Sequence, residues 1–316
     1  MADLRRDLRG EAVIVSPGRA DRPYDFNVGG DDRRQRCPFC PGREAQTPPE
    51  VDAVRREGSE KDKPGWQVRV VPNRYPAFPR EPDGEGSAYG VHEVIIETPD
   101  HARSLVDLTV PELVVVMDVW RRRIRVARED PAIHFASIFK NHGARAGASL
   151  EHAHSQLMAV PFVPQRVAAE LAAWRDGSAA KRLALDLEDS ALQVLRSDHS
   201  VVVCPSFARF SWESWIMPLD DEARFEDTSD QTLQDAAVQL HSLLRAMNQA
   251  LEHPHYHLLV STAPLQTEGS DSYRWRIELF PRLAQVAGFE WATGVFVNQT
   301  PPESAAEGLR AQATNP

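Results

Sequence analysis

The chain has 316 residues, of which 42 % are hydrophobic and 26 % are charged, and its 46 acidic and 36 basic residues give a net charge of −10. This balance excludes a mainly disordered chain, and the acidic charge argues against non-specific binding to DNA or RNA. No apolar run approaches the roughly 20 residues that span a bilayer, and the N-terminus lacks an apolar signal core. Three cysteines do not make a disulfide framework, so we expect a reduced, cytoplasmic protein without a membrane partner.

The first half of the chain predicts several strands around one long helix. Thr109 and Glu112 have the spacing of a capping box, and apolar residues recur at helical spacing from Leu113 to Ala127. β-Branched residues indicate strands on both sides of this helix. The predicted strands are residues 12–15, 66–71, 91–97, 134–139 and a segment around 152–160.

The second half repeats this order of elements. Strands are predicted at 200–204, 213–218, 256–261 and 273–280, with an amphipathic helix over 228–251. Segment 93–101 aligns position by position with segment 213–221. We therefore predict an α+β fold of two tandem copies of one unit, residues 1–185 and 186–316, with long amphipathic helices packed on antiparallel sheets. The tail from about residue 305 is predicted to be a short helix at most, followed by disorder.

The richest chemical pattern lies between residues 139 and 156. On a strand, the alternate residues His152, His154 and Gln156 point to one face. The loop before them carries Gly143, Gly147 and Ser149 and can bring main-chain N–H groups close to an anion. A neutral imidazole can attack phosphorus while nearby donors stabilise charge on the phosphate oxygens. The pattern therefore favours phosphoryl or nucleotidyl transfer over a pair of structural histidines.

The pair Cys37-x-x-Cys40 allows a zinc site, a redox pair or a coincidence. There is no second such pair and no βαβ context, so a four-cysteine site is excluded and a redox pair is disfavoured. Zinc needs about four ligands, and the other candidates are His101 and one of His152 and His154. If one of these two histidines binds the metal, the other is left as the nucleophile.

Other candidate residues have two interpretations each. Arg19 and Arg22 could clamp phosphates or lie in a solvated loop, and Asn73 could contact a base or ribose or cap a turn. Cys204 lies in an apolar strand and is expected to be a buried, inert thiol. The histidines at 253, 255 and 257 are expected to be structural.

Taken in order along nearly the whole chain, these motifs resemble the galactose-1-phosphate uridylyltransferase family. That family belongs to the histidine-triad superfamily and carries two such domains in one chain. The sequence also resembles the related ADP-glucose phosphorylases. The motifs that carry the resemblance are Arg19-x-x-Arg22-Pro23, Cys37-x-x-Cys40, Pro72-Asn73, Pro99-Asp100-His101 and the run from Asn141-x-Gly to His152-x-His154-x-Gln156.

The resemblance implies a role for each matching residue. His154 matches the nucleophile of a covalent nucleotidyl intermediate, and Gln156 matches an amide that binds a phosphate oxygen. Arg19 and Arg22 match arginines that reach the substrate across a homodimer interface. The implied structural zinc ligands are Cys37, Cys40, His101 and His152. The implied nucleotide and phosphate contacts are Asn73, Phe139, Asn141, Gly147, Ala148 and Ser149.

The second half departs from the family pattern. Glu170 matches a ligand of a second metal, but Arg274 and Arg276 stand where the first copy has His152 and His154. Arginine does not deprotonate to act as a nucleophile or ligand. We therefore predict that the second half is catalytically silent and that a second metal is absent, with the arginines either binding phosphate or lying on a solvated face. Ser155 is a further departure, inside the central motif.

The resemblance implies an enzyme that moves a uridylyl group between UDP-glucose and galactose 1-phosphate through a histidyl-nucleotide intermediate. Its partners would be a nucleotide sugar and a sugar phosphate. An ADP-glucose phosphorylase, or a transferase acting on another nucleotide sugar, is the alternative within this class. A nucleotide hydrolase and a non-catalytic, zinc-stapled nucleotide-binding module are alternatives from other classes.

Overall fold

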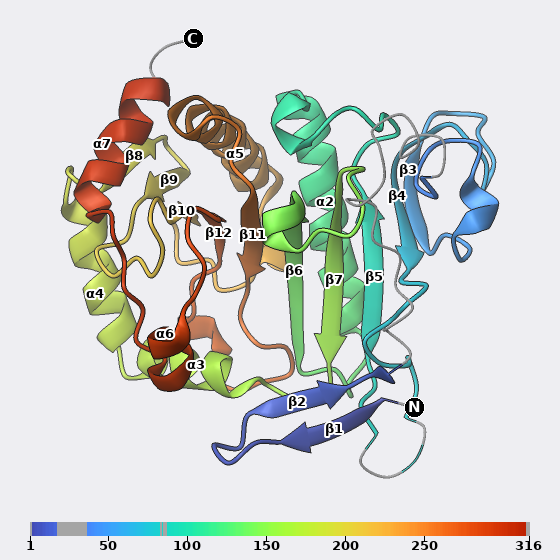
Figure 1. Ribbon diagram of the computed structural model, residues 1–316, viewed down its shortest axis with the longest axis horizontal. Helices are drawn as coiled ribbons and strands as arrows, with labels where there is room; N and C mark the ends of the chain where they lie inside the picture. The colour runs from blue at the N-terminus through green and yellow to red at the C-terminus, as the bar shows by residue number, and fades with distance from the viewer. Residues whose placement is uncertain (1, 18–36, 83, 85–86, 314–316) are drawn as a thin grey trace.

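The computed structural model describes residues 2–17, 37–82, 84 and 87–313. Its strands are β1 (Asp3–Arg6), β2 (Ala12–Val15), β3 (Asp52–Arg55), β4 (Trp66–Pro72), β5 (Val91–Ile96), β6 (Phe135–His142), β7 (His154–Val160), β8 (Gln193–Arg196), β9 (Ser200–Val203), β10 (Ser214–Pro218), β11 (Tyr256–Ser261) and β12 (Arg276–Pro281). Ten of them form one sheet in the order β3-β4-β5-β7-β6-β11-β12-β10-β9-β8, while β1 and β2 pair separately (Figure 1). The large sheet is antiparallel throughout.

Two long helices cover one face of this sheet. The helices are α2 (Val110–Arg128), α3 (Gln165–Arg175), α4 (Ser178–Glu188), α5 (Asp230–Leu251), α6 (Gly288–Thr293) and α7 (Pro302–Ala313). Helices α2 and α5 lie side by side behind the strands, and α7 packs along α5 (Figure 1). The predicted capping box of Thr109 and Glu112 begins α2, and Ser229 caps α5 by accepting a hydrogen bond from the Thr232 N–H.

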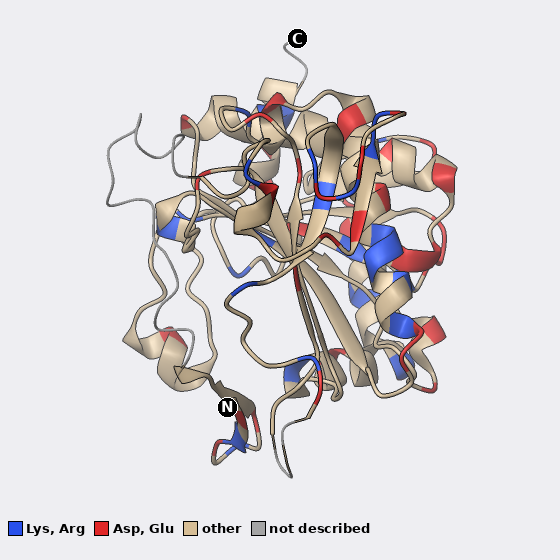
Figure 2. Ribbon diagram, turned by 90° about the vertical axis from the view of Figure 1, so that its right-hand side faces the viewer, with Lys and Arg blue, Asp and Glu red and all other residues tan. Residues whose placement is uncertain are grey.

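The apolar stripes of α2 and α5 form the main core with the inner face of the sheet. Trp120 on α2 and Leu240 on α5 are fully buried there. Burying one large apolar side chain stabilises a fold by about 1.5–3 kcal/mol, so this layer holds the sheet rigid. Acidic and basic residues are interspersed over the outer surfaces of the helices (Figure 2). No helix among the described residues has the length and apolar character to cross a membrane.

The strand register shows the internal repeat directly. Gln156 on β7 stands opposite Phe139 on β6, which stands opposite Leu259 on β11, which stands opposite Glu278 on β12. In this row, β7 and β6 of the first half are followed by β11 and β12 of the second. Because β11 corresponds to β6 and β12 to β7, the row is symmetric about the β6–β11 pair. It ends on Val94 of β5 and Trp215 of β10. The prediction of two tandem α+β units is therefore confirmed, and the two halves share one continuous sheet.

The same register corrects one detail of the internal alignment. Because Val94 corresponds to Trp215, the residue aligned with Glu93 is Ser214 rather than Glu213. Glu93 points to the helix layer and pairs with Arg123 at 2.7 Å. The predicted alignment was wrong by one residue, and a shift of one residue moves a side chain to the opposite face of a strand.

Two further expectations concern the second half. The predicted boundary between residues 185 and 186 falls inside α4, and the division into two domains stays a prediction. The predicted short helix in the tail is confirmed, because α7 ends at Ala313, and residues 314–316 lie outside the described residues. Its Ala305, Ala306 and Leu309 are buried in the main core, and this tertiary packing stabilises a helix that is weak in isolation.

Candidate active site and metal cluster

Cys37, Cys40, His101 and His152 converge at the edge of the first half. One ligand atom from each of the four residues lies within 4.8 Å of all the others. The Nδ1 atom of His152 is 3.6 Å from Cys37 Sγ and 3.7 Å from Cys40 Sγ, and His101 Nδ1 is 3.5 Å from Cys40 Sγ. The two cysteines come from the loop before β3. His101 comes from the turn after β5, and His152 comes from the segment just before β7.

These distances fit a tetrahedral metal ion. Zinc bonds of about 2.3 Å to sulfur and 2.1 Å to nitrogen place the sulfur and nitrogen ligands about 3.6 Å apart. His152 Nε2 lies 2.7 Å from the Thr98 carbonyl, to which it must donate, so Nδ1 carries the lone pair that faces the cysteines. Burial lowers the pKa of His152 to about 4, which keeps its ring neutral at pH 7, as a ligand requires.

His154 is the first residue of β7, two positions after this ligand. Its Nδ1 lies 2.8 Å from the His152 carbonyl, which can only accept, so Nδ1 carries the proton and Nε2 carries the lone pair. Behind the strand, the buried Lys140 donates to the His154 carbonyl at 3.1 Å and to Glu97 at 2.6 Å. The tautomer of His154 and the backbone that carries it are thus both fixed by hydrogen bonds.

The expectation that His152, His154 and Gln156 alternate on one strand was wrong for His152. The strand begins at His154, and His152 lies before it, where the chain turns toward the cysteines. His152 therefore lies outside the strand ladder, with its side chain among the four donors. His154 and Gln156 do share one face of β7, as predicted.

Gln156 is oriented by a histidine that the sequence did not single out. The Ala77 N–H donates to His92 Nδ1 at 3.0 Å, so His92 Nε2 carries a proton and donates to Gln156 Oε1 at 3.0 Å. Asn73 Nδ2 lies 3.4 Å from the same oxygen. With its oxygen held in this way, the Gln156 amide keeps its NH₂ group for another acceptor.

A cavity of about 470 Å³ lies over these side chains. Both His154 and Gln156 line it, together with Asn73 and Ser149 from the predicted set. Phe39 joins the cavity to the metal cluster, because its ring centroid is 5.4 Å from that of His154 and 6.1 Å from that of His152. The other lining residues are Pro38, Gln46, Thr47, Pro48, Val71, Pro72, Arg74, Tyr75, Val94 and Leu150.

The loop before β7 is braced by the second half of the chain. Gly143 has φ +80°, and a Cβ there would lie 2.5 Å from the ring of His255. That ring accepts a hydrogen bond from the Arg145 N–H at 2.9 Å, and His257 Nδ1 lies 2.9 Å from Asn141 Oδ1. The role of His255 and His257 is thus structural, as expected from the sequence.

The remaining predicted residues do not line the cavity or lie outside the described residues. Phe139 and Asn141 lie on the same face of β6, where Phe139 stands opposite Gln156. Gly147 and Ala148 belong to the loop, but neither lines the cavity. Arg19 and Arg22 lie outside the described residues. No sequence pattern selects His92 or Phe39, because their contacts come from distant segments. The local signal for His92 is a polar residue in a fully buried strand, which it shares with Glu93.

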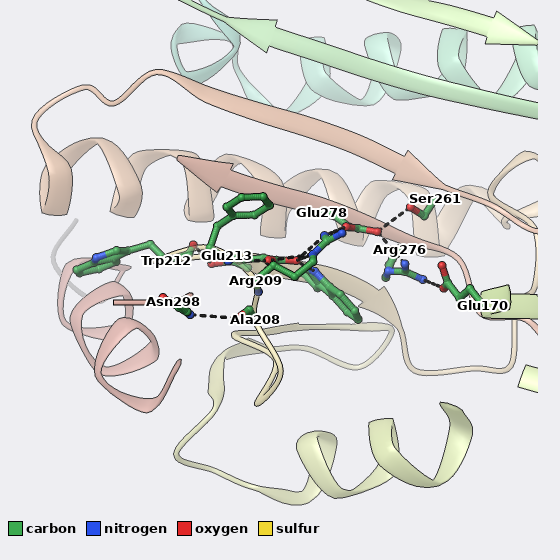
Figure 3. A network of polar contacts seen from close by, with 12 residues as sticks. Glu170, Ala208, Arg209, Trp212, Glu213, Ser261, Arg276, Glu278 and Asn298 are labelled. Carbon is green, nitrogen blue, oxygen red and sulfur yellow. Dashed lines mark hydrogen bonds and ion pairs between the residues drawn. The ribbon is translucent and has the colours of Figure 1, made fainter. Parts of the chain in front are cut away.

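In the second half, Arg276 occupies the place of His154. It is 6 % exposed and lies between two carboxylates, with Nη1 2.6 Å from Glu170 and Nη2 2.8 Å from Glu278 (Figure 3). A solvated strand face is therefore wrong for Arg276. Arg274 pairs with Asp221. Cys204 is buried as predicted, and burial raises the pKa of its thiol to about 12.

Comparison with known proteins agrees with this architecture. The family model described as galactose-1-phosphate uridyl transferase, N-terminal domain, matches residues 83–164. The chain is 32 % identical to ADP-glucose phosphorylase of Arabidopsis thaliana, over 98 % of this chain and 92 % of that protein. It is 27 % identical to galactose-1-phosphate uridylyltransferase of Thermotoga maritima, over 98 % of each. The crystal structure of the Arabidopsis ADP-glucose phosphorylase with bound ADP-glucose superposes with a TM-score of 0.78, at 33 % identity, covering 98 % of this chain and 99 % of that one.

The fold and these likenesses together define a protein of the histidine-triad-like superfamily with two units in one chain. Within that class, the chain belongs to the galactose-1-phosphate uridylyltransferase family of transferases.

Proposed function

We propose that this chain transfers a nucleotidyl group by double displacement, with His154 as the covalent nucleophile. The observation that carries the proposal is the 2.8 Å hydrogen bond from His154 Nδ1 to the His152 carbonyl, which places the proton on Nδ1 and the nucleophilic lone pair on Nε2. His154 also lines a cavity of about 470 Å³, a size that suits a nucleotide ligand.

In the first half-reaction, Nε2 attacks the α-phosphorus of the nucleotide sugar. A P–N bond forms, and the P–O bond to the sugar phosphate breaks, so that the sugar 1-phosphate leaves with the bonding electron pair. In the second half-reaction, a phosphate oxygen of the acceptor attacks the same phosphorus, and the electrons of the P–N bond return to Nε2. The P–N bond forms in the first half-reaction and breaks in the second, while a P–O bond breaks in the first and forms in the second. Both half-reactions are therefore reversible.

Gln156 stabilises the charge on the transferring group. Its Oε1 is held by His92 at 3.0 Å, and its NH₂ group is the donor that remains for a phosphate oxygen. One well-placed donor of this kind is worth about 3–4 kcal/mol of transition-state stabilisation. We assign Ser149, which lines the same cavity, and Asn73 to nucleotide binding.

We propose that the four-donor cluster holds a structural zinc ion. When bound, the ion would cross-link the loop of Cys37 and Cys40 to the start of β7. The side chain of His152 would then bind the metal, while its carbonyl accepts the hydrogen bond from the imidazole of His154. This arrangement restrains the imidazole of His154 before substrate arrives.

The leading reaction is uridylyl transfer between UDP-glucose and galactose 1-phosphate, supported by the named relative from Thermotoga maritima. ADP-glucose phosphorolysis is the second candidate. It is supported by the higher identity to the Arabidopsis enzyme, 32 % against 27 %, and by the ADP-glucose bound to that protein's solved structure. The covalent step is the same in both.

Intact-mass spectrometry tests the proposal and separates the two candidates. The protein is mixed with UDP-glucose or with ADP-glucose, and then with galactose 1-phosphate or inorganic phosphate. We expect a gain of one uridylyl group from UDP-glucose and its removal by galactose 1-phosphate. Adenylylation reversed by phosphate would select the second candidate. If neither nucleotide sugar gives an adduct, covalent transfer is excluded.

We further propose that the enzyme is a cytoplasmic homodimer. Thiolate ligands must stay reduced, which a reducing compartment provides. The segment around α6 leaves Phe289, Trp291, Val295 and Val297 exposed, and exposed apolar groups of this kind mark association surfaces. The molar mass in solution tests the dimer, and a monomer at micromolar concentration would contradict it.

A further inference from the structure

A second cavity, of about 500 Å³, lies on the same face of the sheet in the second half. Leu259 and Glu278 line it, and these residues belong to the strand row that contains Gln156. Helices α3 and α4 form its other wall. It is therefore the internal-repeat counterpart of the cavity over His154, and its volume is similar.

The polar floor of this cavity is a chain of alternating charges (Figure 3). Glu170 pairs with Arg276, which pairs with Glu278, and Arg209 joins Glu278 to Glu213, with N···O distances between 2.6 and 2.8 Å. Arg276 also lies over the ring of Trp215, 4.4 Å from its centroid. Each of these charges has a partner of opposite sign, and neither arginine can act as a nucleophile.

Two further arginines line the cavity from its helical wall. Arg166 in the first turn of α3 and Arg182 in α4 are both exposed. Within the described ranges, neither guanidinium has a hydrogen bond or an ion pair to a carboxylate. Partial burial of the Arg166 guanidinium, and then the nearby Arg209, lower the pKa of Arg166, and an anion beside it would stabilise its charge. A phosphate is the anion that guanidinium groups bind best, through two parallel hydrogen bonds.

Aromatic side chains form most of the apolar lining. Trp174 on α3 packs against Tyr273 with ring centroids 5.7 Å apart, and Phe207 packs against Trp215 at 5.3 Å. Trp174, Trp215 and Tyr273 are buried behind this lining, and Phe207, which is 40 % exposed, offers a flat surface on which a planar ring can pack. A ligand that matches both features combines a flat ring with an anionic group.

From these features we infer a second ligand site, which binds a nucleoside phosphate without reacting with it. The base packs against Phe207, and the phosphate pairs with Arg166 and Arg182. Arg276 holds the position of His154 and pairs with Glu170 and Glu278, so the site binds but does not transfer. The inference depends on this cavity alone and stands independently of the reaction at His154.

Isothermal titration of the full chain with UMP and with AMP tests this site. We expect two sites per chain for at least one of them in the wild type. The double variant Arg166→Ala/Arg182→Ala should weaken one site at least tenfold and leave the other. The matched control Arg56→Ala/Arg196→Ala removes the same charge from exposed positions outside the cavity and should keep both. Ala173→Trp, which fills the cavity without changing charge, should also remove one site.

Competition identifies the part of the ligand that is recognised. Uridine or adenosine, inorganic phosphate and glucose 1-phosphate should each bind the second site at least tenfold more weakly than the nucleoside monophosphate. Equal binding by glucose 1-phosphate would overturn the assignment of a base. A single wild-type site that the double variant leaves intact would overturn the inference.

The two proposals fail in different ways. If the reaction at His154 is wrong but the second site exists, the double variant still loses a nucleoside phosphate site and no adduct forms in any sample. If the second site is wrong, the double variant and its control bind nucleotide alike and are labelled alike by nucleotide sugar.

Discussion

The imidazole of His154 donates from Nδ1 to the main-chain carbonyl of His152 at 2.8 Å, while the ring of His152 lies 3.6 Å from Cys37 Sγ. His152 thus faces the four-donor cluster with its side chain and His154, the proposed nucleophile, with its backbone. Loss of the cluster is therefore expected to alter the orientation of the His154 imidazole through this single carbonyl.

Replacing the nucleophile should abolish turnover without unfolding the protein. We expect His154→Ala to lower the transfer rate by about 10⁴-fold or more, because no other group can form the covalent intermediate. His253→Asn is the control, since His253 is exposed and asparagine tolerates its φ of +59°. Steady-state kinetics and circular dichroism make the measurement, and wild-type activity in His154→Ala would refute the assignment.

Removing the metal should destabilise the first half and disable His154 together. We expect about one zinc per chain by elemental analysis and little in Cys37→Ser, with a lower melting temperature and a lower transfer rate. Cys204→Ala is the control, because its thiol is buried in the main core far along the sheet and should not alter metal content. A zinc-free Cys37→Ser variant with full activity would show that the cluster does not position the nucleophile.

His92 should act through Gln156 rather than on the substrate. We expect His92→Phe to lower kcat about 10- to 100-fold with little change in KM, since losing a buried hydrogen bond costs about 1–3 kcal/mol. In a double-mutant cycle with Gln156→Ala, the second substitution should add little. Effects that add fully would mean that His92 does not act through the amide.

The decrease in the free energy of unfolding at acidic pH should depend in part on His142. Burial lowers the pKa of His142 to about 3, so between pH 6.5 and 3 the unfolded chain binds more protons than the folded chain. Stability contributed by the neutral ring is therefore present above pH 6.5 and is lost as the pH falls. His142→Phe keeps the stacking on Tyr256, where the centroids are 4.6 Å apart. It should reduce the loss of unfolding free energy between pH 7.5 and 5 by up to about 2 kcal/mol. Urea titrations at the two pH values measure this, and an unchanged loss would mean that His142 does not titrate across this range.

Local patterns predicted much of the fold and the central motif. The capping box at Thr109, the helical stripes and the β-branched runs each depend on residues close in sequence, and so does the spacing of His154 and Gln156. The internal repeat followed from the order of these elements. The one-residue error at Glu93 arose because sequence similarity alone does not fix which face of a strand a residue occupies.

Long-range contacts account for what could not be predicted. His92 gains its hydrogen bonds from Ala77 and Gln156, and the buried Arg276 pairs with Glu170, which reaches it from α3. Helix α7 is stable because α5 and β8 pack against it, which its composition does not reveal. In each case the partner lies far along the chain and is brought close by the fold.

The most direct test of the account is to locate the nucleotidyl group on the protein. After brief reaction with nucleotide sugar, the chain is digested at neutral or alkaline pH, because the P–N bond is labile in acid, and the peptides are sequenced by tandem mass spectrometry. The account predicts one modified residue, His154, with His152 unmodified. A nucleotidyl group on any other residue would contradict it.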